Sequence, residues 1–213
     1  MTESDFLNYW NVLYSKENFF GSGPTKLAKL AEEILSKEDS KILEIGCGQG
    51  RDALHFSKLG YHVNAFDLSE NAVNYVNKAK EIFSFDNLNV FVHDATKKLD
   101  FPMAYFDFVY SNLALQFFEI DLLSKILSNT HKMMKKNSKF LLSTKKEGDK
   151  YYQTGKKINE YAYEHKGIIR YFYPIEKLEK IFNENFNIIS MEHDSHKNLD
   201  SSVSVWWKIL LEK

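Results

Sequence analysis

The sequence predicts an α/β fold in which a mostly parallel sheet carries helices on both faces. From residue 41 onward, short apolar runs typical of strands alternate with segments whose apolar residues recur at helical spacing. The first run, 41–45, passes directly into Gly46, Gly48 and Gly50, a pattern typical of a ligand-binding loop between a strand and a helix. Such alternation favours parallel strands joined by helical crossovers.

The amino-terminal part predicts two helices that precede the sheet. Apolar side chains at helical spacing open the chain, namely Phe6, Tyr9, Trp10, Leu13 and Tyr14. The stretch 21–24 contains two glycines and a proline, which end this helix, and Thr25 is suited to cap a second one. We interpret residues 1–37 as a helical appendage.

The elements of the sheet follow in order. After the glycine loop we expect a helix at 51–59, a strand at 61–66, a helix at 70–83 capped by Ser69, and a strand at 88–92. Strands at 105–110 and 138–144 flank a helix at 119–136. A helix at 175–184 and strands at 186–193 and 203–211 complete the chain.

Residues 145–174 interrupt this rhythm with a polar stretch, a predicted short helix and the segment 168–174. We interpret them as an insertion over the carboxyl edge of the sheet, where open α/β sheets bind ligands. No repeat or linker divides the chain, and 213 residues suit one core. The sequence therefore predicts a single domain, 1–213.

Composition points to a protein of the reducing cytoplasm. The net charge is −1, so no basic excess suggests nucleic acid or an anionic membrane as a partner. Cys47 is the single cysteine, which excludes an internal disulfide. No apolar run is long enough to span a membrane, and the first residues lack the pattern of a signal peptide.

Acidic residues stand at three successive strand ends. Glu44 lies in a strand with buried neighbours, where a free carboxylate is costly unless a ligand uses it. Asp67 follows Gly50 by seventeen residues, which suits a carboxylate that holds ribose hydroxyls. Asp94 is able to accept from an adenine amino group while the Ala95 amide donates to the ring. The plainer alternatives are a surface residue for Glu44, a helix cap for Asp67 and a turn former for Asp94.

Together these positions resemble the S-adenosylmethionine site of class I methyltransferases, over residues 38–145. The resemblance implies a Rossmann-like methyltransferase fold, with a seven-stranded sheet whose last strand is antiparallel. It also implies S-adenosyl-L-methionine as cofactor and S-adenosyl-L-homocysteine as product. The implied cofactor-binding residues are Glu44, Gly46, Cys47, Gly48, Gly50, Arg51, Asp67, Leu68, Asp94, Ala95 and Ser111.

The run Gly-Gln-Gly-Arg-Asp-Ala-Leu at 48–54 resembles the tellurite-resistance and thiopurine methyltransferase-like branch. That branch tends to carry a histidine where this chain has Gln116, which cannot take a proton at neutral pH. Its polar substrate-side groups match His165 and Arg170, our candidate catalytic residues, although His165 reads equally well as an exposed helix residue. The candidate substrate-binding residues are Trp10, Tyr14, Asn112, Gln116 and Tyr171.

The expected acceptor is a small molecule. The strand end at 110–118 lacks the Asn/Asp-Pro-Pro-aromatic run of methylases that act on base amino groups, and Cys47 is committed to the glycine loop. With a candidate base missing, a soft sulfur, selenium or tellurium nucleophile is favoured. His193 and His196, on the expected hairpin between the last two strands, lack a third clustered ligand, so no metal site is expected. The expected assembly is a monomer or a homodimer.

Two other functions remain open from sequence. The first is a regulatory or interaction module that binds S-adenosylmethionine without turnover. The second is an NAD(P)-dependent oxidoreductase, which is disfavoured because Arg51 stands where the dinucleotide fingerprint needs its third glycine.

Overall fold

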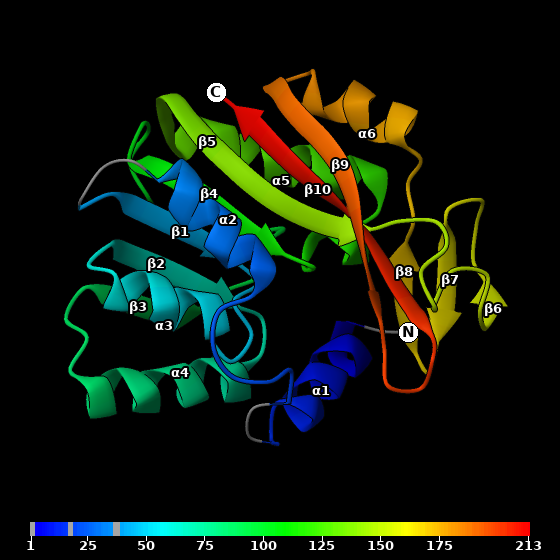
Figure 1. Cartoon of the computed structure of the whole chain (residues 1–213), viewed down its shortest axis with the longest axis horizontal. Coiled ribbons are helices and arrows are strands. Elements are labelled where there is room, and N and C mark those ends of the chain that lie inside the picture. The colour runs from blue at the N-terminus through cyan, green and yellow to red at the C-terminus, as the bar shows by residue number, and fades with distance from the viewer. Residues whose placement is uncertain (1–2, 17–18, 36–38) are drawn as a thin grey trace.

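A seven-stranded sheet forms the centre of the computed structural model, which describes residues 3–16, 19–35 and 39–213. Its strand order is β3-β2-β1-β4-β5-β10-β9 (Figure 1). The first five strands in this order pair in parallel, and β10 runs antiparallel to both of its neighbours. The fold class expected from the sequence, including the antiparallel last strand, is confirmed.

The element bounds agree closely with those expected. The helices are α1 (Glu3–Leu13), α2 (Lys26–Ile34), α3 (Arg51–Lys58), α4 (Glu70–Phe83), α5 (Ile120–Met133) and α6 (Ile175–Phe182), with a short 3-10 turn η1 (Leu115–Phe117). The strands of the main sheet are β1 (Lys41–Ile45), β2 (His62–Asp67), β3 (Leu88–Val92), β4 (Phe106–Asn112), β5 (Met134–Lys145), β9 (Asn187–Lys197) and β10 (Val203–Glu212). The capping residues Thr25 and Ser69 accept from the amides of Ala28 and Ala72. No described helix has the length and apolar character to cross a bilayer.

Alternate side chains of the central strands pack into two hydrophobic cores, one on each face of the sheet. Ile42, Phe108 and Tyr110 pack with helices α2, α3 and α4, while Leu43 and Val109 pack with α5 and α6 on the opposite face. This division follows from the period of two along a strand. Both faces of the central strands are therefore covered, and ligands have access only at the strand ends.

The insertion differs from the prediction. Instead of a short helix, residues 145–174 contain a small antiparallel sheet of β6 (Lys156–Lys157), β7 (Ala162–His165) and β8 (Ile168–Tyr171). Lys166 and Gly167 both have positive φ, which suits the tight turn of a hairpin. His165 therefore lies on strand β7, so the alternative of an exposed helix histidine was wrong. The small sheet lies beside the β9–β10 hairpin in Figure 1.

Three element boundaries differ from those expected from the sequence. Helix α5 ends at Met133 because Met134 already pairs with Phe106 as the start of β5. Strand β4 continues to Asn112, two residues beyond its expected end. Strand β9 extends to Lys197, so His193 and His196 lie on the strand and not on the connection between strands.

Gly50, at the end of the glycine loop, lies against Val76 of helix α4. Its φ is +73°, and a Cβ there would lie 2.7 Å from Val76 Cγ2. Gly50→Ala is expected to lower the free energy of unfolding by about 2 kcal/mol or more, because the left-handed conformation alone costs roughly 1–2 kcal/mol. Urea-induced unfolding measures the loss.

Gly60→Ala provides the matched control for this prediction. Gly60 also has positive φ, +93°, but nothing lies within 4 Å of a Cβ built there. The excess loss at Gly50 should shrink when Val76 is also replaced by alanine. Equal losses at the two glycines would contradict the role given to the Val76 contact.

Candidate functional site

The glycine loop follows β1 and forms the centre of the candidate site. Gly46, Gly48 and Gly50 all have positive φ, of +73°, +52° and +73°. The amides of Gly46 and Cys47 donate to Phe66 O at 2.9 and 3.0 Å, which ties the loop to β2. A Cβ on Gly46 would lie 2.4 Å from Ala114 Cβ, so the loop passes too close to the end of β4 for any side chain there.

Glu44 is an unusual buried acid at the end of β1. It is 3% exposed, and its Oε2 has no hydrogen-bond partner among the described residues. Burial raises the pKa of this carboxyl well above its usual value, and the charges of Asp52 and Asp67 raise it further. A bound group that carries positive charge or N–H donors would relieve this cost.

Asp67 lies at the end of β2 and faces the glycine loop. Its Oδ2 accepts from the Gly48 amide at 2.8 Å, and its Oδ1 accepts from the Ser69 amide at 2.9 Å. Burial raises the pKa of this carboxyl, while these amides act in the opposite direction. Each carboxylate oxygen keeps a lone pair, so Asp67 is oriented and still able to accept from a ligand hydroxyl. Leu68, the next residue, is half-buried.

Asp94 follows β3 and forms a turn. Its Oδ1 accepts from both the amide and the hydroxyl of Thr96 at 2.8 Å, and its Oδ2 lies 3.7 Å from Lys97 Nζ. Asp94 therefore forms a turn, which the sequence analysis gave as the alternative to adenine binding. Ala95 packs against the core on the α5 face. Their contacts with an adenine ring stay a prediction.

The end of β4 is fixed to both neighbouring strands. Ser111 Oγ donates to Ile45 O at 3.0 Å, and Asn112 Oδ1 accepts from Ser143 Oγ at 2.6 Å. Ser111 is fully buried. These two candidates therefore set the relative position of the ends of β1, β4 and β5.

The amino-terminal segment covers the glycine loop. A Cβ on Gly48 would lie 2.8 Å from the Tyr14 hydroxyl, so Tyr14 packs directly on the loop backbone. Burial and the nearby Asp67 charge raise the pKa of Tyr14 well above its usual value. Asn11 Oδ1 accepts from Ser69 Oγ at 2.7 Å, which joins α1 to the start of α4.

Side chains of the loop hold the next part of that segment. Gln49 Nε2 donates to Lys16 O at 2.8 Å, and Gln49 Oε1 accepts from the Phe19 amide at 2.9 Å. Arg51 donates to the carbonyls of Gly23 and Phe20. The guanidinium of Arg51 is therefore engaged with the chain itself.

A second anchor lies beneath the loop. Asp52, buried at the start of α3, accepts from the Thr25 amide and hydroxyl at 2.8 Å and from the Tyr110 hydroxyl at 2.6 Å. The sequence analysis missed this network. Thr25 was identified only as a cap, and nothing in the local sequence pairs Asp52 with Tyr110.

An aromatic wall, formed by Tyr14, Trp10 and Phe117, continues from the glycine loop to the turn η1 after β4. Trp10 stacks on Tyr14 with ring centroids 5.6 Å apart and meets Phe117 edge to face at 5.2 Å. Next to Phe117, Gln116 is 4% exposed, and its Oε1 has no donor among the described residues. The structure thus joins the candidates Trp10 and Tyr14 through ring contacts, and Gln116 directly precedes Phe117 in the chain.

The insertion places one candidate residue, Arg170, next to the aromatic wall and two others, His165 and Tyr171, away from it. Arg170, which is 7% exposed, has its guanidinium carbon 5.7 Å from the Phe117 ring centre. His165 is half-buried with its ring 5.5 Å from that of Tyr151. Tyr171 points to the other side of β8, as the alternation of a strand requires, and stacks on Tyr173 at 5.5 Å. Arg170 therefore reaches the aromatic wall, and Tyr171 packs away from Arg170.

Comparison with known proteins gives one family match that covers most of the chain. The model of the family described as tellurite resistance protein TehB matches residues 14–198. A probable S-adenosyl-L-methionine-dependent methyltransferase TehB of Haemophilus influenzae is 34% identical over 93 residues, which are 42% of this chain and 30% of that relative. The matched part thus spans less than a third of the relative's length.

Solved structures share the fold. A SAM-dependent methyltransferase from Methanosarcina mazei has a TM-score of 0.75 at 19% identity, covering 86% of this chain and 96% of the other. A Burkholderia thailandensis 1,6-didemethyltoxoflavin-N1-methyltransferase, solved with its substrate and S-adenosylhomocysteine, has a TM-score of 0.72 at 16% identity and covers 99% of this chain and 86% of the other. At these identities the likeness establishes the fold alone.

Replacing Glu44 tests the electrostatics of the loop. The folded-state pKa of Glu44 is raised, so the protonated form is favoured in the fold and stability is lost as pH rises through that pKa. Glu44→Gln should therefore resist urea better than the wild type at neutral pH. The advantage should fade as the pH falls from the raised folded-state pKa toward about 4.3, the usual carboxyl value, and be absent below it.

Glu33→Gln on the exposed face of α2 is the matched control and should leave stability unchanged. A Glu44→Gln protein that is less stable than the wild type at neutral pH would mean that the carboxylate already has a favourable partner.

Proposed function

Because the chain belongs to the tellurite resistance protein TehB family, we propose that it is an S-adenosylmethionine-dependent methyltransferase acting on a small-molecule acceptor. The observation that carries the proposal is the buried, unpartnered Glu44 carboxylate oxygen on the strand that leads into the glycine loop. The carboxyl groups of Glu44, Asp52 and Asp67 around this loop suit a cofactor that carries an ammonium and a sulfonium charge.

Different residues at the carboxyl edge of the sheet bind different parts of the cofactor. Glu44 would accept from the amino group of the methionine part, while the glycines at 46 and 48 let Ala114 and Tyr14 pack directly on the loop and fix its position. Asp67, oriented by the Gly48 and Ser69 amides, accepts from the ribose hydroxyls. Ser111 keeps the end of β4 in register with this edge.

S-adenosylmethionine supplies the methyl group: an acceptor lone pair bonds to the methyl carbon as the carbon–sulfur bond breaks, leaving S-adenosylhomocysteine. Such an in-line displacement depends mainly on holding the acceptor in near-attack geometry. Trp10, Tyr14 and Phe117 form the apolar wall that excludes water from this region.

The chemistry of the acceptor side favours a nucleophile that needs no general base. Gln116 occupies the buried position next to Phe117, and an amide cannot take a proton at neutral pH. His165 lies against Tyr151 on the insertion and not on the aromatic wall. A thiolate or a selenium or tellurium anion, already ionised, meets this condition.

Cofactor binding is tested with S-adenosylhomocysteine and variants of Asp67. Asp67→Ala should weaken binding in a calorimetric titration at least tenfold, equivalent to about 1.4 kcal/mol. Asp67→Asn keeps an oxygen for the Gly48 amide and should fall between wild type and Asp67→Ala. Asp100→Asn, at an exposed aspartate outside the strand ends, serves as the control. Unchanged affinity in Asp67→Ala would remove the ribose assignment.

Turnover is tested with an acceptor panel of thiols, selenite, tellurite and heterocycles, measuring formation of S-adenosylhomocysteine. We expect conversion with the soft anions and a strong loss of rate in Asp67→Ala at subsaturating cofactor. Tight cofactor binding with no conversion of any acceptor would instead favour the module that binds without turnover.

A further inference from the structure

Arg170 is a buried cation without an anionic partner in the described part of the chain. Its exposure is 7%, and its one hydrogen bond among those residues runs from Nη1 to Ile168 O at a long 3.4 Å. A guanidinium has five N–H donors in a rigid fork. An unpaired buried charge is costly, so most of these donors are available to a ligand at a considerable energetic gain.

Two aromatic rings hold the guanidinium in place. Its carbon lies 4.3 Å from the ring centre of Tyr151 and 5.7 Å from that of Phe117. Contacts of this kind use the face of the guanidinium and leave its N–H edge free. Arg170 is therefore fixed in orientation by contacts that do not consume its donors.

The neighbouring cation, Lys145, is already neutralised. At the end of β5, Lys145 Nζ lies 2.5 Å from Asp149 Oδ2, and both side chains are buried. Burial lowers the pKa of Lys145, Asp149 raises it, and the nearby positive charge of Arg170 lowers it further. The buried carboxylate of Asp149 is thus paired with Lys145, and the excess positive charge lies on Arg170.

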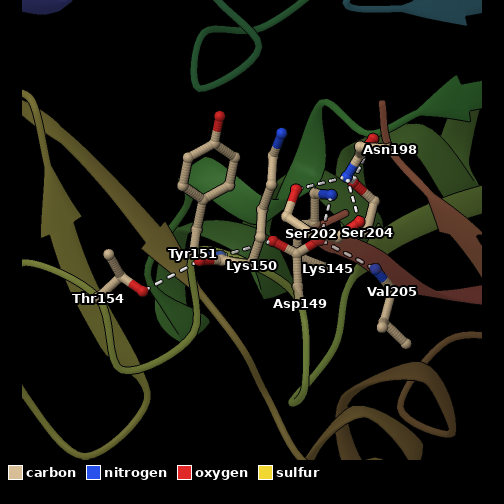
Figure 2. Close-up of polar contacts among 9 residues, drawn as sticks. All are labelled: Lys145, Asp149, Lys150, Tyr151, Thr154, Asn198, Ser202, Ser204 and Val205. Atoms are coloured by element: carbon tan, nitrogen blue, oxygen red, sulfur yellow. Dashed lines mark hydrogen bonds and ion pairs between the residues drawn. The ribbon is translucent and has the colours of Figure 1, made fainter. Parts of the chain in front are cut away.

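Asp149 is occupied and acts as a positioning residue (Figure 2). Besides Lys145, its carboxylate accepts from the amides of Tyr151 and Val205, each at 3.0 Å. The bond to the Tyr151 amide fixes the residue whose ring lies against Arg170. Figure 2 shows Asp149 between the loop that carries Tyr151 and strand β10. The Tyr151 ring points away from the Asp149 carboxylate.

A chain of side-chain contacts runs from Arg170 through the aromatic wall to the glycine loop, where the cofactor is proposed to bind. Phe117 contacts both Arg170 and Trp10, and Trp10 stacks on Tyr14, which packs on Gly48. Arg170 is therefore on the acceptor side of the glycine loop.

We propose that Arg170 binds a carboxylate, or a comparable oxyanion, carried by the methyl acceptor at a position other than the atom that is methylated. The inference rests on the proposed function. Charge-assisted hydrogen bonds stabilise the lone pairs that they engage, so a nucleophile held by the guanidinium would lose reactivity. A spectator anion instead orients the acceptor and leaves its nucleophilic atom free.

The test uses mercaptoacetate and mercaptoethanol, thiols of equal chain length that differ in the carboxylate. Each is titrated calorimetrically into protein saturated with S-adenosylhomocysteine, and acetate is titrated as a competitor. The wild type should bind mercaptoacetate at least about tenfold more tightly than mercaptoethanol. Arg170→Gln should abolish this preference, and Lys156→Gln, which removes an exposed cation from the same small sheet, should retain it.

Equal affinity for the two thiols in the wild type, no detectable binding of mercaptoacetate or acetate, or a preference that survives Arg170→Gln would each overturn the inference. The titration with S-adenosylhomocysteine that precedes each experiment tests the proposed function separately. Its affinity in Arg170→Gln should equal that of the wild type, which also verifies that the variant is folded. Repeating the anion titrations without S-adenosylhomocysteine decides the role of Arg170 even if the cofactor does not bind.

Discussion

Three carboxyl groups, those of Glu44, Asp52 and Asp67, lie around the glycine loop. The backbone of this loop has positive φ at three positions, a conformation that glycine adopts most easily. The charges of the other two raise the pKa of Glu44, so the arrangement carries an electrostatic cost in the absence of a ligand. Folding tolerates this cost because Asp52 and Asp67 are satisfied by hydroxyl and amide donors. The unsatisfied Glu44 oxygen is therefore the point at which the fold gives up stability for binding.

Opposite charges are separated across the carboxyl edge of the sheet. The acidic group lies at the ends of β1 and β2, while the excess positive charge of Arg170 lies beyond β5 on the insertion. Between them stands an apolar wall of Trp10, Tyr14 and Phe117. Under the proposed function, this separation would direct a cationic methyl donor and an anionic acceptor to different ends of one site and so favour a single relative orientation of the two.

Local sequence predicted the sheet and the helices around it, because glycine spacing, capping residues and strand periodicity are short-range signals. The caps at Thr25 and Ser69 belong to this class. The bond between the Gly48 amide and Asp67 was not predicted, and the cofactor contacts stay a prediction. The hairpin of β7 and β8 was missed because its signal is the backbone of Lys166 and Gly167, not a hydrophobic pattern. Asp149 was missed for a different reason: its partner Val205 lies fifty-six residues away.

The segment between α1 and α2 is attached through its main chain. Gln49 and Arg51 contact the backbone of Lys16, Phe19, Phe20 and Gly23, and none of these bonds involves a side chain of that segment. Every amino acid except proline offers the same amide and carbonyl. These bonds therefore make no demand on the side chains at 16, 19 and 20, whereas Gly21 and Gly23 are constrained by positive φ and Tyr14 by its packing on Gly48.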